Sequence, residues 1–166
     1  GGYSVEFRAF NDGIAYRFIT NKKGMINVKN ETLQVNFPDN YLLHMQQSGS
    51  FKTAYEEEYT HLYSKEWKSS ASMALLPILI DTQKGSKILI SETSLTDYPA
   101  VFLKSNGSNG MVSVFPKVPL EFGEDGDRSV KILKEADYIA QTSGKRNFPW
   151  RYFVISTEDS QLIENT

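Results

Sequence analysis

Cysteine is absent from this 166-residue chain, and histidine occurs only twice. Without cysteine there is no disulfide framework, no thiolate nucleophile and no zinc site built on thiolates. The two histidines, His44 and His61, stand far apart in the sequence, and no serine or acid is placed to form a catalytic triad with them. We therefore expect both to be surface or packed imidazoles, and no complete active site is visible.

A charge excess and long hydrophobic runs are missing as well. The formal net charge is −2, and no basic stripe predicts a nucleic-acid partner. The longest apolar run covers residues 73–80 and contains Pro77, whereas a membrane-spanning helix needs roughly 20 apolar residues. We expect neither nucleic acid nor a membrane span. We interpret the Gly1-Gly2 start as trimmed or processed, so the missing signal peptide does not indicate a cytoplasmic origin.

Aromatic residues, by contrast, are abundant. They make up 13% of the chain, which favours strands. Residues 3–9 and 14–18 alternate between apolar and polar, the period of half-buried strands. Between them lies Asn11-Asp12-Gly13, and Asp-Gly is a strong turn signal. The first twenty residues are therefore predicted to form a β-hairpin.

The rest of the chain repeats this pattern at short intervals. Turn residues separate its apolar runs, and such spacing is typical of a sandwich or barrel. We predict an all-β fold, an antiparallel β-sandwich, in one domain over residues 1–166. The expected further strands cover residues 32–37, 73–80, 87–91, 100–104, 111–115 and 151–155.

Two segments leave the type of structure open. Residues 55–67 are polar, aromatic and acidic, and fit a long loop or a helical turn. Residues 129–140 have apolar side chains at helical spacing, but also fit a strand that ends at Ala140 before a turn at residues 143–145. We favour the strand for the second half of this segment.

Acidic residues are the remaining candidates for chemistry. Glu56, Glu57 and Glu58 are adjacent, so their carboxylates repel one another unless they are solvated or bound to a cation such as calcium. A solvated loop is the simpler interpretation. Glu92 follows a predicted strand, where its carboxylate is expected to cap backbone N–H groups. Nothing in the sequence fixes the distance between two carboxylates, as glycoside hydrolysis would require.

Four motifs together resemble a known family. They are residues 7–18 (FRAFNDGIAYRF), Glu56-x-x-Tyr59, residues 92–98 (ETSLTDY) and residues 149–151 (PWR). In this order and spacing they are similar to the N-terminal domain of glycoside hydrolase family 97, over nearly the whole chain.

The resemblance implies a periplasmic α-glucosidase or α-galactosidase as the parent enzyme. Its N-terminal domain would be a β-super-sandwich similar to galactose mutarotase, joined to a catalytic (β/α)₈ barrel. Calcium would lie in the active site, held mainly by barrel glutamates and by one glutamate of the N-terminal domain. By motif position that residue is Glu56, with Glu57 in reserve.

Two parts of the family pattern are missing: the stretch before the hairpin and the catalytic barrel. We therefore expect a partial super-sandwich, whose unpaired strand edges invite pairing with another chain. The expected function is that of an accessory domain that braces the barrel and donates one calcium ligand. An oligosaccharide would be the parent's ligand, and no catalytic residue is expected in this segment.

The alternative is a non-catalytic carbohydrate-binding module. In it Trp67 or Trp150 would form a platform for a sugar ring, although burial is the simpler expectation for both. We expect Arg151 to act as a structural latch, paired with an acid such as Asp12 or Asp97 or stacked on Trp150.

Overall fold

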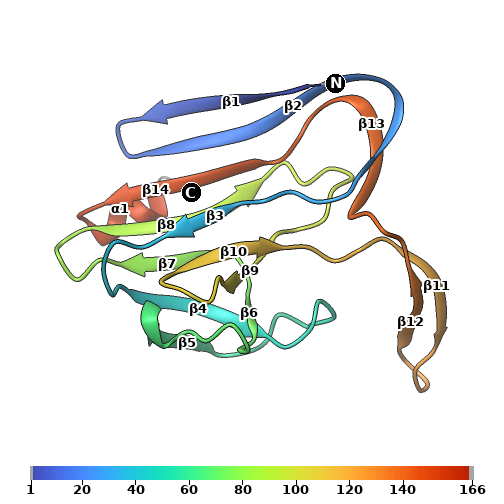
Figure 1. The fold of residues 1–166 in the computed structure, drawn as a ribbon. Coiled ribbons are helices and arrows are strands. Elements are labelled where there is room, and N and C mark those ends of the chain that lie inside the picture. The colour runs from blue at the N-terminus through green and yellow to red at the C-terminus, as the bar shows by residue number, and fades with distance from the viewer. Residues whose placement is uncertain (1, 165–166) are drawn as a thin grey trace.

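The computed structural model describes residues 2–164, and nearly all of their regular structure is antiparallel β (Figure 1). The all-β prediction is therefore confirmed. The first strands are β1 (Tyr3–Phe10), β2 (Gly13–Val28), β3 (Gln34–Asn36), β4 (Leu42–Ser48), β5 (Tyr59–Tyr63), β6 (Met73–Ala74) and β7 (Ile78–Asp81). They are followed by β8 (Lys87–Thr93), β9 (Phe102–Ser105), β10 (Gly110–Val114), β11 (Pro119–Glu124), β12 (Val130–Glu135), β13 (Ala140–Asn147) and β14 (Trp150–Ser156).

Helical structure is limited to a 3₁₀ turn at Ser64–Glu66 and the six-residue α1 (Asp159–Glu164) within the described range. Among residues 2–164, no helix has the length and apolar character needed to cross a membrane.

One curled sheet forms the body of the molecule. Its strand order is β1-β2-β14-β8-β7-β4-β6-β9-β10-β3, with β13 beside β2 and β5 beside β4. β4 belongs to both layers, because its first part pairs with β5 and β7 while Gln47 and Ser48 pair with β6. Through β4 the sheet turns over, so that β9, β10 and β3 cover β7 and β8 (Figure 1).

The core fills the space between these layers. Side chains that alternate along the strands point inward and are at most 1% exposed: Leu43, Met45, Ile78, Ile80 and Ile90 from one layer, Leu103 and Met111 from the other. Full burial of one such side chain contributes about 1.5–3 kcal/mol. The mutual cover of the layers therefore stabilises the fold without any disulfide.

The predicted N-terminal hairpin is present. β1 pairs with β2 from Tyr3↔Thr20 to Phe10↔Gly13, and Asn11-Asp12 form the turn. β2 is longer than expected, because its second half continues along β13. β13 and β14 lie end to end on the same side of β2, separated only by Phe148 and Pro149.

The two ambiguous segments each contain a strand. Residues 55–67 also include the 3₁₀ turn at Ser64–Glu66, in line with the helical-turn alternative. The strand favoured for the second half of residues 129–140 is wrong, because the strand lies in the first half and residues 136–139 are irregular. Residues 59–63 form β5, and residues 130–135 form β12, which pairs with β11 in a separate hairpin. The expected turn at residues 143–145 is wrong, because β13 runs through them with a bulge. Gly144 permits this close approach: a Cβ atom there would lie 2.7 Å from the carbonyl oxygen of Lys22 on β2.

The sheet has open edges. β1 and β3 end the pairing path, and among the described residues no strand pairs with the outer edge of β1. Tyr3 and Phe7 on this strand are 67% and 71% exposed. Self-association through this edge stays a prediction.

Gly13 provides a test of the hairpin's position. A Cβ atom at Gly13 would lie 2.1 Å from the carbonyl oxygen of Phe153, so alanine would push β14 away from β2. We expect Gly13→Ala to lower the free energy of unfolding by at least about 1–3 kcal/mol, as overpacking does. Denaturant unfolding measures this. Gly49→Ala, where no atom lies within 4 Å of the added Cβ, should change little; equal stability of both variants would contradict the close approach.

Candidate functional site

A buried charge cluster lies between the layers, centred on Arg151. The Arg151 side chain is 1% exposed; its Nε donates to Glu31 Oε1 at 3.0 Å, and its Nη1 donates to Glu92 Oε2. Glu92 also accepts the backbone N–H of Val101 at 3.1 Å. The cluster thus joins β14, β8 and the segments before β3 and β9, a position that fits the predicted structural latch.

The partners of Arg151 differ from the prediction. No ion pair joins it to Asp12 or Asp97 in the described part of the chain, and Trp150 points to the opposite face of the strand. Glu31 was not expected, since it is 120 residues from Arg151 in the sequence and no local pattern marks it. Glu92 accepts one backbone N–H, that of Val101, which fits the capping expected of it.

Burial controls the protonation of this cluster. Desolvation raises the pKa of Glu92 to about 7, although the Arg151 guanidinium opposes the rise. Desolvation and the nearby Glu31 carboxylate also raise the pKa of the Tyr16 phenol to about 12. Near neutral pH, therefore, the Glu92 carboxyl is partly protonated although it lies beside the Arg151 guanidinium.

On the outer face, Trp150 is held by two arginines. The guanidinium carbons of Arg8 and Arg17 lie 4.6 and 4.4 Å from the centre of its ring. Glu6 accepts hydrogen bonds from both arginines, and the bond from Arg17 is the main reason that the pKa of Glu6 is lowered. This arrangement fastens β1 and β2 to the start of β14.

The two candidate sugar platforms differ in their exposure. Trp67 is 3% exposed and its Nε1 donates to the carbonyl of Ser72, so its ring offers no face for stacking. Trp150 is half-buried and lines an open pocket of about 570 Å³ together with Phe10 and Tyr152. Of the two, only Trp150 is accessible to solvent, and Arg8 and Arg17 already lie over its ring.

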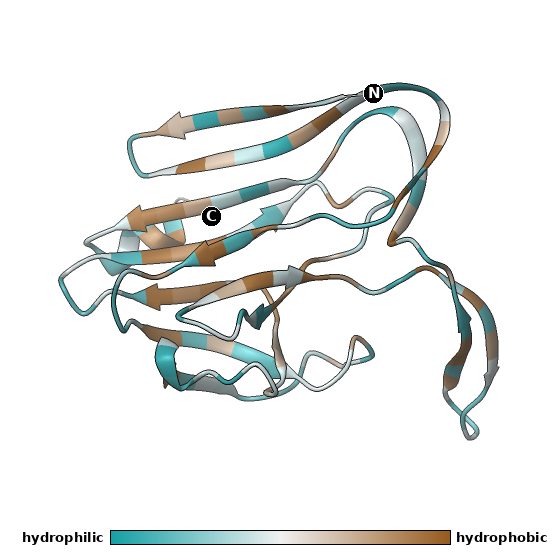
Figure 2. Ribbon diagram, viewed as in Figure 1, coloured by the Kyte–Doolittle hydropathy of each residue, from teal (hydrophilic) through white to brown (hydrophobic). Residues whose placement is uncertain are grey.

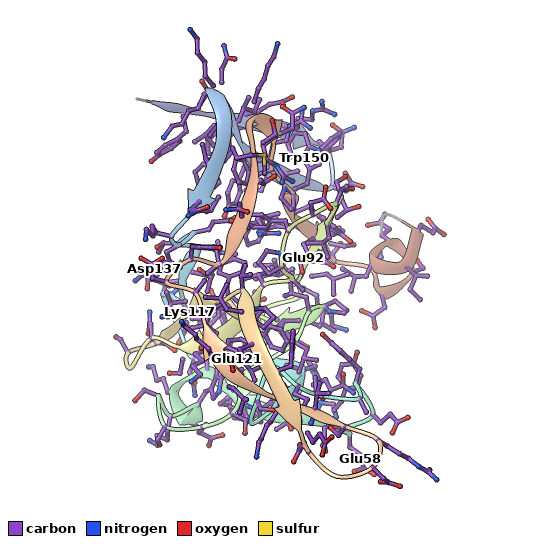
Figure 3. All side chains as sticks on the ribbon, turned by 90° about the vertical axis from the view of Figure 1, so that its right-hand side faces the viewer. Glu58, Glu92, Lys117, Glu121, Asp137 and Trp150 are labelled. Carbon is purple, nitrogen blue, oxygen red and sulfur yellow. The ribbon has the colours of Figure 1, made fainter. Side chains whose placement is uncertain are left out.

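The acidic loop lies at another end of the molecule. Figure 3 shows Trp150 towards one end and Glu58 at the other, near the β11–β12 hairpin. Gln46 of β4 holds the loop backbone, because its Nε2 donates to the carbonyls of Tyr55 at 3.2 Å and Glu57 at 2.5 Å. Tyr55 has a φ of 59°, a left-handed conformation that turns the chain sharply before Glu56.

The side chains of Glu56, Glu57 and Glu58 are exposed, and they make no hydrogen bond or ion pair within residues 2–164. No group of three or more His, Cys, Asp or Glu side chains in that range is arranged to hold a metal ion. Calcium requires about 6–8 oxygen ligands. The loop can therefore offer a carboxylate to a calcium ion, but it is not a complete calcium site.

Beside this loop stands a hairpin with exposed apolar residues. β11 and β12 pair only with each other, and Figure 2 shows hydrophobic segments along this projecting ribbon. Lys52, which precedes the acidic loop, donates to Asp125 and to the Val130 carbonyl at 3.0 Å each. The tip of the hairpin therefore contacts the segment that leads into the acidic loop. The exposed apolar side chains of these two segments are Phe51, Tyr55, Leu120, Phe122, Val130, Ile132 and Leu133.

Removal of the Arg151 charge tests the latch. In Arg151→Met, two carboxylates would stay buried without their cation, and we expect a loss of about 3–5 kcal/mol in the free energy of unfolding. Thermal or denaturant unfolding measures it. Arg128→Met removes an arginine whose side chain is 92% exposed and should leave stability unchanged. A loss no greater than that of the control would show that the cluster is dispensable.

The chain is similar to known proteins in both sequence and fold. The chain is 31% identical over 171 residues to a retaining alpha-galactosidase of Bacteroides thetaiotaomicron, an alignment that covers 96% of this chain and 26% of the relative. The chain thus spans about a quarter of that protein's length.

Solved structures with the same fold include a glycoside hydrolase family 97 enzyme from a Pseudoalteromonas species in complex with acarbose. It has a TM-score of 0.70 and 21% identity, with 94% of this chain and 21% of that one covered. A beta-arabinopyranosidase has a TM-score of 0.67 and 20% identity, with 93% and 25% covered.

The family described as Glycosyl-hydrolase 97 N-terminal matches the sequence over residues 1–166. Because this match spans the whole chain, the chain belongs to the N-terminal domain family of the glycoside hydrolase 97 enzymes.

Proposed function

We propose that this domain braces the catalytic barrel of a parent glycoside hydrolase and donates Glu56 to a calcium ion at their interface. The parent would cleave α-linked glucosides or galactosides; the name of the Bacteroides relative supports the latter. A periplasmic location belongs to the same proposal. The observation that carries it is an exposed apolar hairpin whose tip contacts the segment that leads into the acidic loop.

The hairpin supports a docking role. An isolated two-stranded hairpin is marginally stable in water, yet Phe122 and Ile132 face each other on β11–β12 while 56% and 49% exposed. Exposed apolar patches of this kind mark interaction sites. A barrel packed against the hairpin would cover these side chains and fix the hairpin's position.

The loop supports the ligand role. Gln46 fixes the backbone on both sides of Glu56 through the carbonyls of Tyr55 and Glu57. The loop's orientation is therefore set by β4, which lies in the centre of the sheet. A carboxylate presented in this way needs only the remaining oxygens from the barrel to complete a calcium shell.

Calcium binding to the parent enzyme tests the proposal. We expect Glu56→Gln in the full-length parent to weaken calcium affinity roughly tenfold or more, the scale on which supporting groups of metal sites act. The 166-residue chain alone should show little calcium binding by calorimetry, because it lacks the other ligands.

Glu58→Gln is the matched control, since it removes a neighbouring exposed carboxylate of the same loop. It should leave calcium affinity unchanged. If Glu57→Gln alone weakened binding, the register of the ligand would shift by one residue. Unchanged affinity in the Glu56 and Glu57 variants would remove the loop from the calcium site.

Carbohydrate binding by the chain itself is the second candidate function. The half-buried Trp150 lines a pocket with Phe10 and Tyr152, and Arg8 and Asp12 on its wall can donate to and accept from sugar hydroxyls. Mixed apolar and polar lining of this size is typical of small-ligand sites.

Titration with malto-oligosaccharides, followed by tryptophan fluorescence, distinguishes the two candidates. Submillimolar binding that is lost in Tyr152→Ala would favour the binding module. We expect no such binding if the domain is a brace. Because Trp67 is buried, a fluorescence change would report mainly on Trp150.

A further inference from the structure

The chain's two histidines, 17 residues apart, meet across neighbouring strands. His44 on β4 is the register partner of His61 on β5, and their Nδ1 atoms lie 2.7 Å apart with ring centres 4.8 Å apart. His61 is exposed and His44 is half-buried, so solvent reaches the pair. Neither calcium donation nor barrel bracing uses these rings.

We propose that His44 and His61 form a two-imidazole clip for a divalent transition-metal ion such as zinc, nickel or copper, bound through both Nδ1 atoms. Zinc binds imidazole nitrogen at about 2.0–2.1 Å, so two such ligands in a tetrahedral shell lie roughly 3.3 Å apart. The observed pair is close to this spacing; to bind the ion, the rings must move apart by a few tenths of an ångström and turn so that both Nδ1 lone pairs converge on it. Water completes the shell.

Metal binding to the pair requires only that one proton move within a ring. In the neutral pair, one ring donates its Nδ1 proton to the Nδ1 lone pair of the other. A metal ion replaces that proton, which moves to the Nε2 atom of the donor ring. Both rings then coordinate as neutral imidazoles, so no net proton is released.

The surroundings favour the neutral, metal-binding form. Desolvation is the main cause that lowers the pKa of His44, and the neighbouring His61 lowers it further. Two further charges act on the ring: Asp81 of β7 raises the pKa of His44, and Lys87 of β8 lowers it. Since Asp81 pairs with Leu42, two residues from His44 on β4, its carboxylate shares that face and can accept a hydrogen bond from a metal-bound water.

Imidazole ligands select the class of ion. They suit zinc, nickel and copper, whereas calcium and magnesium prefer oxygen ligands. The clip is therefore chemically distinct from the carboxylates of the acidic loop. It is nevertheless connected to that loop, because Gln46, which holds the loop backbone, follows His44 by two residues on β4. A metal bridge from β4 to β5 would fix both ends of the segment that carries Glu56.

The test uses the metal-free chain at pH 7.5. Thermal unfolding and calorimetry are recorded with zinc or nickel chloride and, as controls, with magnesium and calcium chloride. We expect zinc and nickel to raise Tm, because they bind the folded pair, and magnesium and calcium to have no effect through this site. Copper adds a spectroscopic signature, since its electron paramagnetic resonance spectrum should show coupling to two imidazole nitrogens.

His61→Gln and His44→Gln are the test variants, and the exposed position of His61 makes the first the safer one for folding. Each should weaken zinc affinity at least roughly tenfold, because the chelate of two linked ligands is lost. Asp81→Asn should have a smaller effect. No binding by the unaltered chain, or binding that survives either His variant, would overturn the proposal. A calcium result has no bearing on this outcome, so the clip and the calcium proposal fail independently.

Discussion

Arg151 carries its positive charge inside the sandwich because Glu31 and Glu92 meet it there. The three side chains come from segments far apart in the sequence, and their pairing fixes β14 against β8 and against the segment that leads into β3. A buried ion pair adds little net stability compared with well-packed apolar groups, but removal of one partner is costly. The cluster therefore acts chiefly as a constraint: once these charges are buried, few alternative arrangements of the layers would satisfy them.

The opposite face of β14 complements this constraint. Successive residues on a strand point to opposite sides of the sheet, so Trp150 lies outside while Arg151 lies inside. Arg8 and Arg17 contact the Trp150 ring and share Glu6. The hairpin β1–β2, whose first strand is mostly exposed, is thus fastened by the residue that precedes Arg151 on β14.

Local patterns in the sequence predicted the parts of the fold that depend on local chemistry. Strict alternation and the Asp12-Gly13 turn were enough for the β1–β2 hairpin. Ile132 and Leu133 gave no such guidance, because a bulge between Glu121 and Phe122 disturbs the pairing and imitates helical spacing. The bulge at Gly144 was hidden for a similar reason, since glycine marks both turns and close strand contacts.

The candidate site was predictable only in part. The motif position selected Glu56, and the structure places it in an exposed loop; the proposed calcium role needs ligands that residues 2–164 do not supply. The partner Glu31 and the His44–His61 pair depend on strand register, which brings together residues with no local relation in the sequence. Burial of Trp67 likewise follows from packing between layers, which a single residue does not reveal.

The place of β14 in the sheet has a consequence for how the chain is made. β14 lies between β2 and β8 and pairs with both, so the N-terminal hairpin cannot join the main sheet before residues 150–156 exist. Pairings of such large sequence separation are slow to form, since the intervening chain must be ordered first. During synthesis Tyr16 and Phe18 of β2, which pack against the core in the finished fold, therefore stay in contact with water until β14 has left the ribosome.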